Sequence, residues 1–206
     1  MPFGFGRKKE PEAGVPPLLP AAEGAAARSV RFLGLTDEWR LEGNMDLAGR
    51  LLDALNQRES ILISDVHWAP VDGSGQLEPA PGIQSMDPYD LIVVVAGPDS
   101  LAARTDEERA AHRVHKVTFD VALEAPPFKV IGTIQVHPGV EPESLLQRGS
   151  QMFAAVTDPV VQISGSNVDL GGAETVLVNR FYLRNVAQVD KSTGAPYAVV
   201  PGKSLG

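Results

Sequence analysis

Asp65, His67 and Asp158 are the side chains whose type and spacing come nearest to a chemical site in this sequence. Asp65 and His67 are two residues apart, so a strand would place both on one face, where a carboxylate and an imidazole form an acid–base pair. Asp158 stands at a matching point later in the chain, and two carboxylates brought together would hold a cation. The simpler interpretation is that each aspartate accepts backbone hydrogen bonds at a strand end. We favour it, because the sequence has neither a serine nucleophile motif nor a third ligand at metal spacing.

The other histidines give no stronger signal. His112 and His115 are three residues apart and would share one face of a helix, but no further ligand follows at a characteristic spacing. The sequence has no cysteine, which excludes disulfides and thiolate metal sites. We therefore predict no catalytic residue, no cofactor and no metal site, and a protein that is not an enzyme.

Two aromatic residues occupy matching strand positions, Trp39 and Phe128. Either they form an aromatic binding surface or they fill a core, and recurrence at a strand position favours the core. With Asp65 and Asp158 they make up the tentative interaction surface of this sequence.

An internal repeat sets the architecture that positions these residues. Residues 30–97 and 117–186 share a series of landmarks in the same order. The paired landmarks are Val30–Phe32 with Val117–Phe119, Trp39 with Phe128, Gly43 with Gly132, Leu51-Leu52 with Leu145-Leu146, Ser64-Asp65 with Thr157-Asp158, and Ile92–Val94 with Val176–Val178. A repeat of this length predicts a duplicated small domain.

Each unit has the pattern β-β-α-β-β. Asp46 would cap the first helix, with Leu47, Leu51, Leu52 and Leu55 at helical spacing, and a second helix is expected over 142–152. The fold class is then α+β, mainly β, with each unit a small twisted antiparallel sheet or partly open barrel with one helix. Gly43 and Gly132 should mark a bulge or a close backbone approach. The expected domains are a disordered tail (1–27), unit 1 (28–98), a linker (99–115), unit 2 (116–190) and an irregular C-terminal tail (191–206).

Composition limits the partners. The net charge is −8, opposite to the field that a nucleic-acid-binding domain needs. Residues 1–27 are rich in Pro, Ala and Gly, and Arg7-Lys8-Lys9 is followed by no apolar signal segment. No apolar run is long enough to span a bilayer. The expectation is a soluble, cytoplasmic protein whose tail docks a partner or membrane surface, or has no role.

Short motifs in both halves resemble a bacterial domain family of unknown function. They are Arg50-Leu51-Leu52-Asp53-Ala54-Leu55-Asn56, Ser64-Asp65-Val66, Thr157-Asp158-Pro159 and Val178-Asn179-Arg180. The helix motif is degraded in the second half, and the closing Asn-Arg is absent from the first. The strand count is also similar to that of Sm-like small barrels, a likeness that implies edge-to-edge assembly and RNA binding.

These observations favour a non-enzymatic scaffold or protein-interaction module that self-associates or docks a protein partner. The alternatives are a small-barrel nucleic-acid-binding protein and, last, a metal-dependent enzyme.

Overall fold

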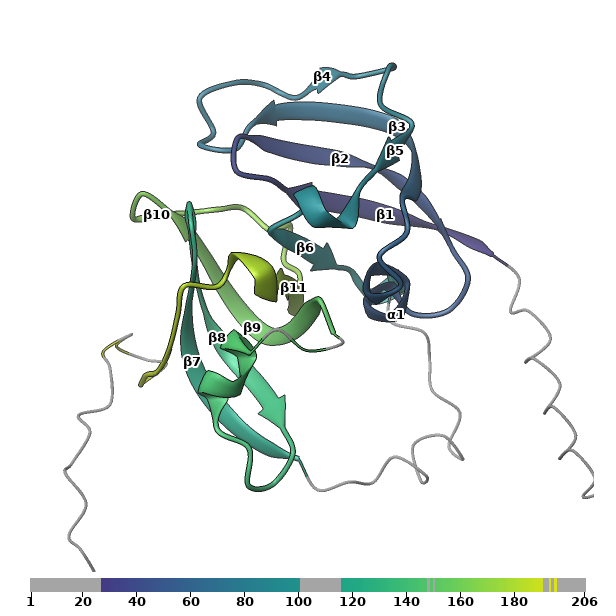
Figure 1. Ribbon diagram of the computed structural model, residues 1–206. Helices are drawn as coiled ribbons and strands as arrows, with labels where there is room; N and C mark the ends of the chain where they lie inside the picture. Colours follow the sequence, from purple (N-terminus) through teal and green to yellow (C-terminus); the bar gives the residue numbers. More distant parts are fainter. Residues whose placement is uncertain are drawn as a thin grey trace, which may run out of the picture.

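The computed structural model describes residues 27–100, 116–147, 149, 151–190, 193 and 195 of the 206-residue chain. These residues form a mainly β structure in which one antiparallel sheet of twelve strands runs through the whole molecule (Figure 1). The predicted tail, most of the predicted linker with His112 and His115, and most of the C-terminal segment lie outside the described residues.

The first half of the chain is a three-stranded meander whose two edges are both extended by later segments. β5 pairs with β3 at one edge and β6 pairs with β1 at the other, so the chain crosses from one edge to the other through the turn η1. The sheet therefore curls on itself, as the upper part of Figure 1 shows. Its elements are β1 (Arg28–Leu35), β2 (Trp39–Leu47), α1 (Leu51–Asn56), β3 (Ile61–Pro70), β4 (Glu78–Pro79), β5 (Ser85–Met86), η1 (Pro88–Asp90), β6 (Val93–Ala96) and η2 (Pro98–Ser100).

The second half follows the same course. β7, β8 and β9 form a meander, β11 pairs with β9, and β12 pairs with β7 after the turn η4. Its elements are β7 (Val117–Ala125), β8 (Phe128–Val136), η3 (Pro142–Leu146), β9 (Phe153–Ile163), β10 (Ser166–Asn167), β11 (Thr175–Asn179), η4 (Arg180–Tyr182) and β12 (Asn185–Gln188).

β6 and β11 connect the two halves, and we call their contact the join. They pair antiparallel, with Val94 opposite Leu177, and every residue of both strands is buried. The predicted repeat pairs Ile92–Val94 with Val176–Val178 as equivalent strands, and this prediction is wrong. β6 lies beside the first strand of its half and β11 beside the third strand of its half. The two strands have similar sequences because they share one buried environment as partners.

The opening strands are also offset from the sequence alignment by two residues. Phe32 lies opposite Gly43 in the first hairpin, whereas Val121, not Phe119, lies opposite Gly132 in the second.

Two apolar clusters fill the halves, and each takes residues from both. Leu177, Met152 and Phe153 of the second half lie in the cluster of the first half with Leu41 and Leu55. Leu33, Leu35, Ile92, Val93 and Val95 of the first half lie in the cluster of the second. The join is therefore a continuation of both cores, and neither half covers its core alone.

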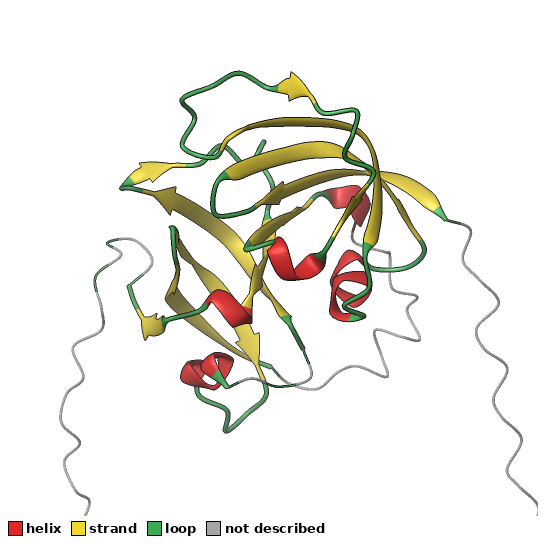
Figure 2. Cartoon of the chain, turned by 45° about the horizontal axis from the view of Figure 1, so that its top comes forward, coloured by secondary structure: helices red, strands yellow, loops and turns green. Residues whose placement is uncertain are grey.

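The first predicted helix is confirmed over Leu51–Asn56 only, and the second is wrong. Asp46 and Leu47 belong to β2, and α1 begins only at Leu51, after Gly49 with φ +102°. The helix expected over 142–152 is a short 3-10 turn, η3 (Figure 2). The Arg180 guanidinium donates to the carbonyls of Ser144, Leu145 and Gln147, and so satisfies acceptors that a longer helix would use. Among the described residues, the first half has the α-helix α1 and the second half has only 3-10 turns, so the prediction of one α-helix in each half is wrong.

The prediction for the two glycines is confirmed. The β2–β3 register shifts at Gly43 and the β8–β9 register shifts at Gly132. A Cβ atom at Gly43 would lie 2.6 Å from the backbone oxygen of Ser64, and one at Gly132 would lie 2.5 Å from the Val156 side chain. Both strands therefore need a residue without a side chain at the bulge.

We expect Gly43→Ala to destabilise the protein by about 1–3 kcal/mol, because the new methyl group must displace backbone. Gly82→Ala is the matched control, since nothing lies within 4 Å of a Cβ atom there. Chemical denaturation of both variants measures the difference. Equal midpoints for the two variants would contradict the close approach at Gly43.

Candidate functional site

Asp65 and Asp158 occupy the same place in their hairpins, on the bulged strand and in the left-handed region, with φ of 51° and 47°. The Asp65 carboxylate accepts a hydrogen bond from Asn44 at 3.2 Å. The Asp158 backbone N–H donates to the Glu174 carbonyl. Both aspartates mark a bulge in which a non-glycine residue takes a left-handed conformation, for which aspartate is well suited.

The two aspartates do not meet. β3 and β9, which carry them, are separated by β2, β1, β6 and β11 in the sheet order. Within the part of the chain that the structure describes, no group of three or more His, Asp or Glu side chains is placed to hold a metal ion. The idea of a cation shared between Asp65 and Asp158 therefore has no geometric basis.

Asp65 and His67 do not form an acid–base pair. The His67 ring nitrogen Nδ1 lies 3.0 Å from the backbone carbonyl of Asp65, not from its carboxylate. His67 is exposed beside Arg31, Glu42 and Asn44 on the outer face of the first meander. Both residues line the same outer hollow, but the Asp65 carboxylate accepts its hydrogen bond from Asn44 and not from His67.

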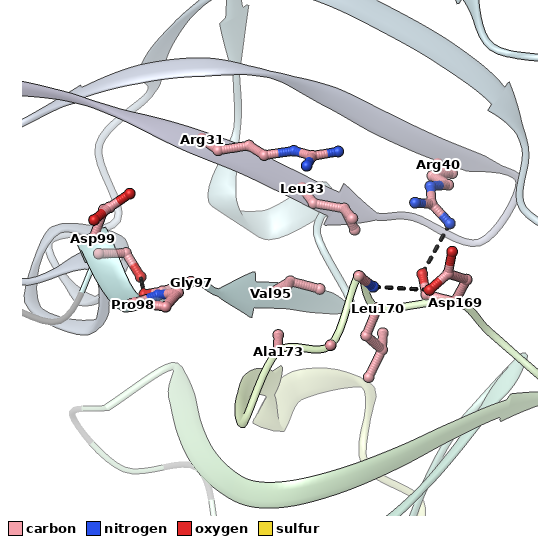
Figure 3. A pocket seen from close by; sticks show the side chains of 13 residues that line it. Arg31, Leu33, Arg40, Val95, Gly97, Pro98, Asp99, Asp169, Leu170 and Ala173 are labelled. Carbon is pink, nitrogen blue, oxygen red and sulfur yellow. Dashed lines mark hydrogen bonds between the residues drawn. The ribbon is translucent and has the colours of Figure 1, made fainter.

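A hollow of about 310 Å³ lies between the halves, where β1 and the end of β6 meet the 169–173 loop (Figure 3). Leu33, Val95 and Ala173 are among its apolar lining residues. Arg40 donates to the Asp169 carbonyl at 2.9 Å and thereby ties the two halves together. The hollow is part of the join.

Glu42 holds the arginines beside this hollow. Arg31 and Arg40 both form ion pairs with its carboxylate, at 2.6 and 2.7 Å. Burial alone would raise the pKa of Glu42, but the hydrogen bonds from Arg31 and Arg40 hold the pKa below its ordinary value. Glu42 offsets one of these two positive charges, and Asp99 and Asp169 also line the hollow, which weakens the case for an anion site.

Glu42 should stabilise the protein in a pH-dependent way. Its pKa is lower in the folded state, so its contribution is present above its ordinary pKa and is lost as the pH falls through the folded value. We expect wild type to be more stable than Glu42→Gln at pH 7, and the difference to shrink at about pH 3. Denaturant unfolding of both proteins at the two pH values tests this. A difference that stays constant with pH would contradict it.

The two aromatic positions have different environments. Phe128 is 2% exposed in the core of the second half, as expected for core packing. Trp39 is half-buried and stacks on Trp68, with ring centroids 4.6 Å apart. In the second half, Val161 occupies the strand position that Trp68 occupies in the first half. Val161 is buried in the same cluster as Phe128.

Trp39 and Trp68 wall a hollow of about 320 Å³ at the junction of the halves. Both lie on the face of β2 and β3 that also carries the core residue Leu41. Tyr182 of η4 closes the other side, and its hydroxyl donates to the Tyr89 carbonyl at 3.1 Å. The remaining lining residues are Thr36, Asp37, Leu41, Ile83, Met86 and Asp90. We call this the aromatic hollow.

Two carboxylates give the aromatic hollow a negative charge. Burial raises the pKa of the Tyr182 phenol, and the charges of Asp90 and Asp37 raise it further. Both aspartates are exposed, and neither has an ion-pair partner among the described residues. None of the described residues that line the hollow is a lysine or an arginine.

Of the tentative interaction surface, the structure places only Trp39 in the aromatic hollow. The sequence-based prediction did not include Trp68, Tyr182, Asp37 or Asp90. One signal was present, because Trp39 and Trp68 are the only two tryptophans in the chain and both lie near strand ends. Tyr182 comes from the other half, and no local pattern points to it.

Comparison of the chain with known protein families, with curated proteins and with solved structures finds no match. The helices of the described residues are all too short to cross a membrane.

Proposed function

We propose that this chain is a non-enzymatic protein-interaction module made of two copies of one small β-barrel unit, and that it docks a partner at the aromatic hollow. Hydrogen bonding at matching positions supports the duplication. The Ile92 N–H donates to Leu35 O, and the Arg184 N–H donates to Glu124 O. Asp87 and Asn179 each cap the following 3-10 turn through a side-chain oxygen.

By this correspondence β6 matches β12, and β5 matches β11. Apart from the two-residue strands β4 and β10, each half is then a five-stranded unit whose fourth and fifth strands flank a 3-10 turn. The join links the fifth strand of one unit to the fourth strand of the next. The join therefore brings together two different surfaces of the unit. A series of such contacts would assemble units into an open array without limit or close them into a ring.

The outer edges carry residues that stop such growth. Leu35, Ile92 and Val93 are fully buried at the join, and their counterparts on the outer edge of the second half are polar and exposed. Met152, Phe153 and Leu177 are likewise buried at the join, and their counterparts on the outer edge of the first half are polar and exposed. The counterparts of Leu35, Ile92 and Val93 are Glu124, Arg184 and Asn185. Those of Met152, Phe153 and Leu177 are Glu59, Ser60 and Ser85. Charged and polar edges disfavour strand addition, so we propose a separate protein partner and not self-association through strand edges.

The observation that carries the function is the aromatic hollow itself. Trp68 is 36% exposed although it stacks on Trp39 over an apolar floor, and an exposed aromatic surface with a concave shape is typical of a binding site. In the second half the corresponding Phe128 and Val161 are covered.

The test is affinity capture from the source organism with full-length wild type, Trp68→Leu and Val160→Ala. Val160 is 40% exposed on β9, away from the hollow, and serves as the matched control. We expect one partner to be retained by wild type and by Val160→Ala and lost by Trp68→Leu. Capture that is indifferent to Trp68→Leu, or no specific capture, would contradict the proposal.

A further inference from the structure

We propose that the aromatic hollow receives an arginine side chain from a basic segment of the partner. This inference rests on the proposed function and names the chemistry that the site would recognise.

The shape and lining of the hollow suit a long side chain with a planar cationic end. Trp39 and Trp68 are stacked, with an interplanar angle of 20°, and Trp68 is 36% exposed. A guanidinium group stacks on the face of a tryptophan and is attracted to its π electrons. The methylene stem of arginine would lie along Ile83 and Met86, which are partly buried in the same hollow.

The charges match this occupant. Asp37 and Asp90 lie on the lining of the hollow, and no described lysine or arginine forms an ion pair with either. A carboxylate accepts two parallel hydrogen bonds from a guanidinium group, an arrangement that an ammonium group does not match. The chain as a whole has a net charge of −8, which favours the approach of a basic segment.

Tyr182 of the second half closes a hollow whose other lining residues belong to the first half, so the site is complete only where the halves meet. Trp39, Trp68 and Asp90 belong to the first half, and Tyr182 belongs to η4 of the second. Tyr89 stacks on Phe181 at 5.8 Å, and the Tyr182 hydroxyl bonds to the Tyr89 carbonyl, so η1 and η4 hold one another in place. The hollow is therefore preformed, which lowers the entropic cost of binding.

Both tryptophans of the chain line the hollow, so the intrinsic emission of the full-length protein reports on this site. The probe is an acetylated peptide of alternating glycine and arginine, compared with the same peptide carrying glutamine in place of arginine. We expect a saturable change in emission with the arginine peptide and none with the glutamine peptide.

Two double variants separate local recognition from general attraction. Asp37→Asn with Asp90→Asn should weaken binding of the arginine peptide about tenfold. Asp46→Asn with Asp99→Asn removes the same charge from exposed sites outside the hollow and should weaken it less than about twofold. Equal losses for the two double variants, or an equal response to both peptides, would overturn the inference.

The two proposals fail in different ways. Capture of a partner that depends on Trp68, together with no saturable response to the arginine peptide, would overturn the arginine inference and leave the interaction function standing. Capture that does not depend on Trp68 would remove the function on which the inference rests.

Discussion

Asn179→Asp should destabilise the protein by about 3–5 kcal/mol, which is the cost of leaving a buried charge without a partner. Asn179 is fully buried at the end of β11. Its side-chain nitrogen donates to the carbonyls of Leu91 at 2.8 Å and Pro88 at 3.4 Å, and its oxygen accepts from the Phe181 N–H. An aspartate keeps the acceptor but turns a negative oxygen toward two carbonyls. Denaturant unfolding measures the loss.

Asp87→Asn is the matched control. Asp87 caps η1 as Asn179 caps η4, but it is exposed and faces no second unit. We expect its substitution to change stability by less than about 0.5 kcal/mol. If Asn179→Asp were as mild as Asp87→Asn, the amide of Asn179 would not hold the join as its geometry indicates.

Phe153→Ala should cost about 3–5 kcal/mol and should destabilise both halves together. Phe153 begins β9 of the second half, yet its fully buried ring lies in the cluster of the first half with Leu55 and Ile61. Its backbone N–H also donates to the Asn56 side chain at 2.9 Å. Removing the ring leaves a cavity in a core that both halves share.

Two probes separate a shared core from independent halves. Tryptophan emission reports on the first half, and circular dichroism reports on all strands. We expect one transition, displaced by the same amount with both probes, and almost no shift in Val160→Ala, where the side chain is 40% exposed. A tryptophan transition unchanged by Phe153→Ala would show that the halves unfold separately.

Landmarks that depend on local geometry were predictable from the sequence. Gly43 and Gly132 were identified because a bulge demands a residue without a side chain, and that demand is visible as a recurring glycine. The mainly β character followed from alternating apolar and polar residues. The 3-10 turn η3 in place of a second helix was not predictable, because Arg180 satisfies the carbonyls of η3 from a distant part of the chain.

The pairing of β6 with β11 was hidden for a different reason. Val93–Ala96 and Thr175–Asn179 have similar sequences because both strands are wholly buried, and a sequence pattern does not distinguish a shared environment from an equivalent position in a repeat. The strand that lies beside the first strand of its half, as β6 does, is β12, and its sequence differs from that of β6 because β12 lies at an edge of the sheet. The aromatic hollow depends on the same join, since Tyr182 reaches it only when the two halves meet.

Site-specific photo-crosslinking tests most directly whether a partner binds at the aromatic hollow or at a strand edge. A photoreactive residue replaces Ile83, which lines the hollow, or Gln188, which lies on the outer strand β12. The two full-length proteins are irradiated in extract of the source organism. We predict a defined adduct from position 83 and none from position 188. An adduct from position 188 alone would show that the partner, or a second copy of the chain, binds at the edge, and would contradict docking at the aromatic hollow.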